Sequence, residues 1–165
     1  GLVGSQFILF SSILSLAIWG FASEILRYRV RTYEISSFRG VLRSLPDLGS
    51  VTMISLAAAV GIPGTGGFVS YALLYVGGFN YHPGIVVTAL VGSIVVTGFL
   101  IQIYRSVFLG EKVEERYSRL SVRERVLLIP LAALIIVVGF VPSPLIDIVQ
   151  ATVGRVIAPG AAGTP

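Results

Sequence analysis

The sequence predicts an all-α fold: a polytopic membrane bundle of about four transmembrane helices, the second of them discontinuous at residues 63–67. Of its 165 residues 55% are hydrophobic and only 12% are charged, about half the charged fraction of a soluble domain. The mean hydropathy is +0.90. Four apolar stretches alternate with polar loops, and the basic residues concentrate in two of these loops.

The composition also excludes several kinds of site. The chain has no cysteine and a single histidine, His82, which excludes disulfides, thiolate ligands and a histidine-rich metal centre. In so apolar a chain, a pI near 9.8 indicates a membrane face rather than a nucleic-acid partner. We therefore expect no metal, no cofactor and no nucleic acid. The numbering starts at Gly1 without a signal-peptide pattern, so we expect the C-terminal piece of a longer protein or half of a split one.

The first and third apolar stretches, residues 6–26 and 84–104, each supply the roughly 20 residues that cross a bilayer. The fourth, residues 126–143, reaches that length only with the segment after Phe140. Residues 144–157 alternate apolar and polar side chains at roughly helical spacing, which is typical of an interfacial helix or a frayed tail. Residues 159–165 are of low complexity, and we expect them to be disordered.

The second apolar stretch, residues 49–78, is too long for one straight helix and too short for two crossings. Pro63 removes a backbone donor and disfavours helical geometry at Ile62. The nearby glycines permit the dihedrals of an unwound turn. We predict that the helix is broken here. Non-helical backbone within a membrane is tolerated only where protein or a wet cavity shields it. The alternative is a continuous, proline-kinked helix. The predicted break comprises Pro63, Gly64, Thr65, Gly66 and Gly67.

Charge predicts the topology. Eleven of the twelve basic residues fall in loops 27–48 and 105–125, and four crossings place both loops on the same side. The positive-inside rule makes that side cytoplasmic. We therefore expect an integral protein of the prokaryotic plasma membrane, embedded in lipid, with Gly1 outside.

Chemistry-bearing residues are scarce within the predicted spans. All eight acidic residues lie at span ends or in loops, whereas charges within the bilayer usually mark ion routes. The remaining hydroxyl groups are expected mostly to join helices. Serine 121 and glutamate 124 fit a capping box that starts the fourth span. No catalytic residue can be assigned.

The order of four segments then identifies a resemblance. "YRVRTYEISSFRGVLRSLP", "GIPGTGGFVSYALLYVGGF", "GFLIQIYRSVFLGE" and "SVRERVLLIPLAALIIVVGFVP" resemble the C-terminal part of the antiporter-like subunits of respiratory complex I (NADH–quinone oxidoreductase), of the subunit M type. The same family includes Mrp cation/proton antiporters and membrane-bound hydrogenases. The resemblance covers nearly the whole chain and implies the last four of fourteen helices.

In that family, a lysine or glutamate just after the break takes up and releases protons. The resemblance places this position at Tyr71, whose ordinary pKa of about 10 is too high for proton cycling at neutral pH. The family pattern Gln-x-x-x-His maps onto Gln6 and Phe10, so the histidine is also absent. The resemblance thus implies a degenerate ion-translocation site.

We therefore expect a membrane-arm subunit of a complex I-type, proton-translocating oxidoreductase, or the C-terminal half of one, with its terminal proton site inactive. The chain itself would be non-catalytic and cofactor-free. Its partners would be other membrane subunits of an NADH–quinone oxidoreductase-like or hydrogenase-like complex. The alternatives are a working Mrp-type cation/proton antiporter subunit and a purely structural membrane subunit. A Lys or Glu inside the membrane, upstream of these residues, would favour the antiporter.

Overall fold

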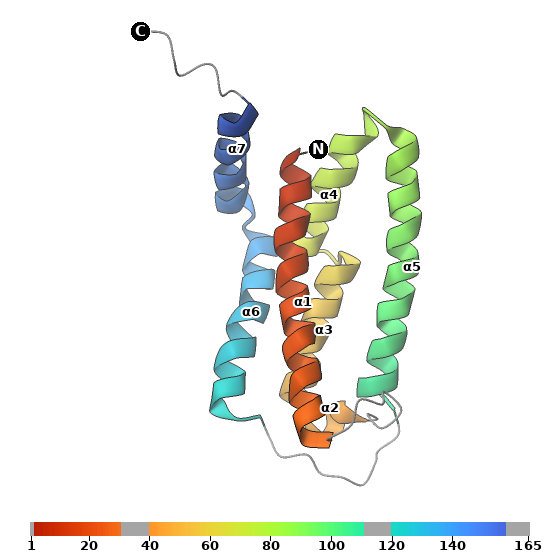
Figure 1. Cartoon of the computed structure of the whole chain (residues 1–165), viewed down its shortest axis with the longest axis vertical. Coiled ribbons are helices and arrows are strands. Elements are labelled where there is room, and N and C mark those ends of the chain that lie inside the picture. Colours follow the sequence, from red (N-terminus) through yellow and green to blue (C-terminus); the bar gives the residue numbers. More distant parts are fainter. Residues whose placement is uncertain (1, 31–39, 111–119, 158–165) are drawn as a thin grey trace.

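A computed structural model of the chain describes residues 2–30, 40–110 and 120–157. Throughout these ranges the regular structure is helical, with no strand, which confirms the predicted all-α membrane bundle (Figure 1). The helices are α1 (Leu2–Val30), α2 (Val41–Ser44), α3 (Pro46–Val60), α4 (Gly66–Phe79), α5 (Pro83–Phe108), α6 (Val122–Phe140) and α7 (Ser143–Ile157).

The second predicted span is discontinuous, as expected. Helix α3 ends at Val60 and α4 begins at Gly66, and together they run from the end of the bundle near α2 to the opposite end (Figure 1). The proline-kinked continuous helix is therefore wrong. Helices α1 and α5 are each long and apolar enough to cross a membrane alone. Helices α6 and α7 would supply a third crossing only as a pair, bent by 83°; four crossings stay a prediction.

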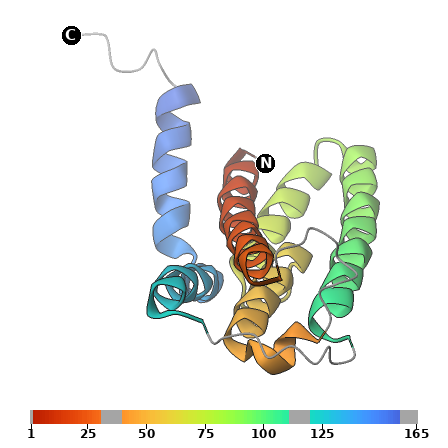
Figure 2. The same cartoon turned by 60° about the horizontal axis from the view of Figure 1, so that its bottom comes forward.

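Helix α1 lies at the centre of the bundle and packs against α3, α4, α6 and α7, whereas α5 lies at the edge (Figures 1 and 2). The core forms where α1 meets α3 and α6. Phe7 and Ile18 of α1 are fully buried, as are Leu48 of α3 and Leu128 of α6. This packing surrounds the break with protein on several sides.

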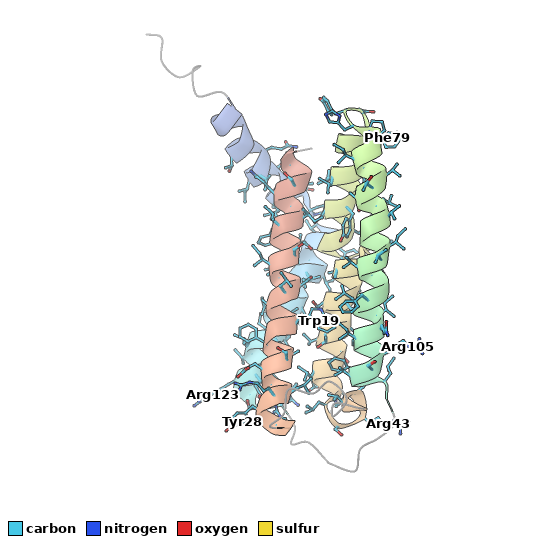
Figure 3. All side chains as sticks on the ribbon, turned by 45° about the vertical axis from the view of Figure 1, so that its right-hand side comes forward. Trp19, Tyr28, Arg43, Phe79, Arg105 and Arg123 are labelled. Atoms are coloured by element: carbon cyan, nitrogen blue, oxygen red, sulfur yellow. The ribbon has the colours of Figure 1, made fainter. Side chains whose placement is uncertain are left out.

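The arginines of α1, α2, α5 and α6 gather at one end of the bundle. Figure 3 shows Arg43, Arg105 and Arg123 at that end and Phe79 at the other, which is the grouping that the charge pattern predicts. Which face of a membrane this end occupies stays a prediction.

Two ion pairs connect helices at the basic end. The guanidinium of Arg29 donates to both carboxylate oxygens of Glu124, at 3.1 and 2.8 Å, and joins α1 to α6. Arg125 pairs with Asp47 at 2.7 Å and joins α6 to α3. Glu124 also completes the predicted capping box with Ser121, which is confirmed. One carboxylate thus both starts α6 and ties it to α1.

The segment after α6 is helical from Ser143, not frayed, and bends sharply away from α6. The fourth predicted span, residues 126–143, therefore ends in the bend. The interfacial position of α7 stays a prediction, and residues 159–165 lie outside the described part of the chain.

Candidate functional site: the helix break

The break begins where Gly61 adopts a left-handed conformation, with φ 81° and ψ 41°. Its N–H donates to the carbonyl of Ala58 at 3.1 Å, and the N–H of Ile62 donates to the carbonyl of Ala57 at 2.9 Å. This pattern is a glycine-centred helix stop. In a continuous helix the carbonyl of Ala59 would accept from residue 63, but Pro63 has no N–H. The sequence therefore leaves one α3 carbonyl without its usual donor.

Helix α4 starts from Thr65, which has extended backbone geometry. Both its N–H, at 3.2 Å, and its hydroxyl, at 2.7 Å, donate to the carbonyl of Ile62. The non-helical segment is therefore residues 61–65, two residues earlier than predicted. Gly66 and Gly67 belong to the first turn of α4, so their assignment to the unwound turn is wrong.

The glycines divide into two physical roles. Gly64 has a φ of 91°, a conformation that favours glycine. Gly66 and Gly67 instead permit close packing: a Cβ on Gly67 would lie 1.7 Å from the carbonyl oxygen of Ala58, and one on Gly66 would lie 3.1 Å from Val138. A side chain on Gly67 would therefore separate α4 from α3, and one on Gly66 would push α4 against α6.

Helix α6 closes the break from another side. A Cβ on Gly139 would lie 2.4 Å from the carbonyl oxygen of Gly64, and the ring of Phe140 lies beside Gly64. Protein thus shields the non-helical backbone there, and polar backbone within a bilayer requires such shielding.

Tyr71 lies one turn into α4 and points back toward the end of α3. Its hydroxyl donates to the carbonyl of Ala59 at 3.0 Å, the same carbonyl that Pro63 leaves without a donor. The ring stacks on Tyr75, with centroids 5.6 Å apart, and also packs on Gly61. The tyrosine therefore closes the hydrogen-bond gap in α3.

A cleft of about 400 Å³ runs beside the break, between α1 and α5. Its lining comprises Ile8, Ser11, Ser12, Ser15, Leu16 and Trp19 of α1, Ala58 and Ala59 of α3, Gly67 and Tyr71 of α4, and Val96 and Leu100 of α5. Figure 3 shows Trp19 between α1 and its neighbours. None of these described residues carries an acidic or basic group.

Two polar groups at the cleft have no partner among the described residues: the hydroxyl of Ser15 and the indole N–H of Trp19. The backbone carbonyl of Ser15 accepts the hydroxyl of Ser55 at 3.0 Å, which joins α1 to α3. The hydroxyls of Thr52 and Ser70 instead bond to carbonyls of their own helix, because a hydroxyl facing its own preceding turn already finds an acceptor there. The expectation that such hydroxyls join helices thus holds for Ser55 and Tyr71 but not for Thr52 and Ser70.

Phe10, the other position that the resemblance singled out, is not among the described residues that line the cleft. Phe10 is partly buried and packs against the hydrophobic core, whereas Gln6 is exposed. The sequence analysis did not identify Ala59 or Gly139 as parts of the site. Ala59 could have been found from the proline four residues later; nothing local marks Gly139.

Comparisons with known proteins agree with this architecture. The sequence model of the NADH:quinone oxidoreductase/Mrp antiporter transmembrane family matches residues 3–97. The chain belongs to this family. It is therefore an integral membrane protein, and the match includes α1, the whole break and α4.

Similar proteins include NADH-quinone oxidoreductase subunit M of Mycobacterium tuberculosis (32% identical over 93% of this chain and 28% of the relative). Those of Rhodobacter capsulatus (30%, over 78% of this chain and 26% of the relative) and Pseudomonas aeruginosa (31%, over 75% and 25%) are also similar. The chain thus spans about a quarter of the length of these relatives.

Proposed function

We propose that the chain is the C-terminal portion of an antiporter-like membrane subunit in a complex I-type, proton-translocating assembly. The observation that carries the proposal is the hydrogen bond from the Tyr71 hydroxyl to the carbonyl of Ala59. This bond lies at the break, within the residues that match the family model. A neutral hydroxyl there satisfies the backbone without a charge. The break then serves as a packing element and not as a proton relay.

The charge distribution supports the same proposal. Among the described residues, acidic and basic side chains lie toward the helix ends, and none lines the cleft at the break. A group that cycles protons must change charge near neutral pH, which an ordinary tyrosine does not do. Redox chemistry and cofactors would belong to partner subunits, and the basic end of the bundle would face the cytoplasm.

Two other functions remain as alternatives. A working cation/proton antiporter would need a charge supplied to the break by a helix outside this chain. The unpaired Ser15 and Trp19 groups favour this possibility, because they leave the cleft able to hydrogen-bond to an incoming group. A purely structural membrane subunit would need no ion route at all.

The test is the Tyr71→Phe variant in the assembled parent complex, reconstituted in vesicles with a pH-sensitive dye inside. We expect an unchanged initial rate of proton movement and a local stability loss of about 1 kcal/mol for the missing hydrogen bond. Tyr75→Phe is the matched control, since it removes a hydroxyl from the stacked neighbouring ring. If Tyr71→Phe abolished proton movement in a complex that still assembles, while Tyr75→Phe did not, Tyr71 would be a working relay.

A further inference from the structure

Helix α5 presents a long, uncovered apolar face. None of its most apolar 18-residue window is buried within the chain. Only its C-terminal end packs inward: Tyr104, Val107 and Phe108 are buried, and the hydroxyl of Tyr104 donates to the carbonyl of Gly49 at 3.1 Å. These contacts fix the rotation of α5, so that the residues between them face outward.

A groove of about 760 Å³ lies on that outward face. It is lined by Gly98, Ile101, Gln102, Arg105, Ser106, Leu109 and Gly110. Spacings of three and four residues place these side chains on one face of a helix. A Cβ on Gly98 would meet nothing within 4 Å, so this glycine leaves open space in the groove.

The groove changes character along its length. Arg105 lies at the basic end of the bundle (Figure 3), and a helical rise of 1.5 Å per residue places Gln102 about 4.5 Å and Gly98 about 10.5 Å farther into the membrane. A phospholipid has the same order of groups: phosphate at the surface, ester carbonyls just below it, and acyl chains beneath. We propose that this groove binds one anionic phospholipid, with its phosphate at Arg105 and Ser106.

The side chains fit each part of that ligand. Arg105 forms no ion pair with any described residue, and none of the described residues that line the groove is acidic; Glu111, the next residue after Gly110, lies outside the described part. Gln102 is exposed and makes no hydrogen bond with the described residues, which would be costly within lipid unless an ester carbonyl accepted from it. One acyl chain would then lie along Ile101 and over Gly98.

Charge favours a lipid over a protein segment as the occupant. An arginine that has no ion pair among the described residues, at the edge of a long apolar face, complements an anionic headgroup, whereas a packed protein helix would have to supply an acid to pair with it. The second basic pocket of the bundle, which also contains Arg43, differs because an acid, Asp47, lies within it and pairs with Arg125. The groove on α5 is therefore the stronger anion site.

The test is native mass spectrometry of the full chain in detergent, titrated with phosphatidylglycerol or with phosphatidylcholine of the same acyl chains. We expect tighter retention of phosphatidylglycerol. Arg105→Gln should weaken it about fivefold, the equivalent of about 1 kcal/mol for one interfacial arginine. Arg123→Gln, which removes an exposed arginine elsewhere at the same end, should leave it unchanged. Equal effects of the two substitutions, or no preference between the lipids, would overturn the proposal.

A second pair of variants tests the apolar part. Gly98→Leu should fill the groove and weaken both lipids, whereas Gly92→Leu, at an equally open glycine outside the groove, should weaken neither. In the parent complex, a photo-crosslinker on Ile101→Cys in this cysteine-free chain should yield adducts of lipid mass. A crosslink to another polypeptide or to a second copy would show that protein occupies the groove, and the lipid site would be refuted.

Discussion

Replacing Gly67 with alanine should separate the two halves of the broken span. The added Cβ would lie 1.7 Å from the carbonyl oxygen of Ala58. Real Cβ atoms essentially never approach another atom closer than 3.0 Å, so α4 must move by more than about 1 Å, the scale of an overpacked core. The obstacle is backbone, which cannot rotate away as a side chain does. The strain therefore falls on the contact between α3 and α4.

The expected cost combines two terms. Overpacking of a close contact destabilises by about 1–3 kcal/mol. Moving α4 also stretches the 3.0 Å bond from Tyr71 to Ala59, and losing such a bond costs about 1 kcal/mol. Since the two terms share one displacement, we expect a decrease of about 2–4 kcal/mol in the free energy of unfolding.

The measurement is unfolding in mixed micelles titrated with sodium dodecyl sulfate, followed by far-UV circular dichroism and by Trp19, the single tryptophan. Two matched variants calibrate it. Gly92→Ala adds a methyl where nothing lies within 4 Å, and Gly66→Ala adds one 3.1 Å from a Val138 methyl that can rotate. We expect the losses to increase in the order Gly92, Gly66, Gly67. If Gly67→Ala unfolds at the same detergent fraction as Gly92→Ala, the close contact does not stabilise the break.

Two further predictions concern the ends of the bundle. Single cysteines at Asn80 and at Ser118, which lies outside the described residues, should react with a membrane-impermeant maleimide from opposite sides; labelling from one side would refute the four-span topology. Arg29→Gln should lower the free energy of unfolding by about 1–2 kcal/mol, less than for a fully buried pair, because it leaves a largely buried carboxylate without its two guanidinium bonds. Arg27→Gln, which breaks an exposed pair within one helix, should have a much smaller effect, and equal losses would contradict this reasoning.

The sequence predicted the parts of the fold that depend on local chemistry. Apolar length located the helices, and the proline with its glycines located the break. The capping box was identifiable because its two residues are three positions apart in the chain. The pair that joins Arg29 to Glu124 was not, because it spans 95 residues and depends on how α6 packs against α1.

The role of each glycine in the break cannot be predicted from the neighbouring sequence. Gly61 and Gly64 have positive φ, whereas Gly66 and Gly67 are helical and are small because the Val138 side chain and the Ala58 backbone, respectively, lie against them. In the sequence all four look the same. The need for a positive φ and the need for close packing both select glycine. Only the positions of α3 and α6 in the structure show which need applies at each glycine. The predicted break was therefore displaced by two residues even though its cause was identified.

The chemistry of residue 71 follows from the carbonyl that it faces. Pro63 leaves the carbonyl of Ala59 at the C-terminal end of α3, where helix carbonyls carry partial negative charge. That environment requires a donor and opposes an anion. Tyrosine supplies a donor that stays neutral at physiological pH, so the backbone is satisfied by protein and needs neither water nor a charge. The break can therefore persist without a charged side chain at residue 71, because the proline that creates it also leaves the acceptor that the Tyr71 hydroxyl fills.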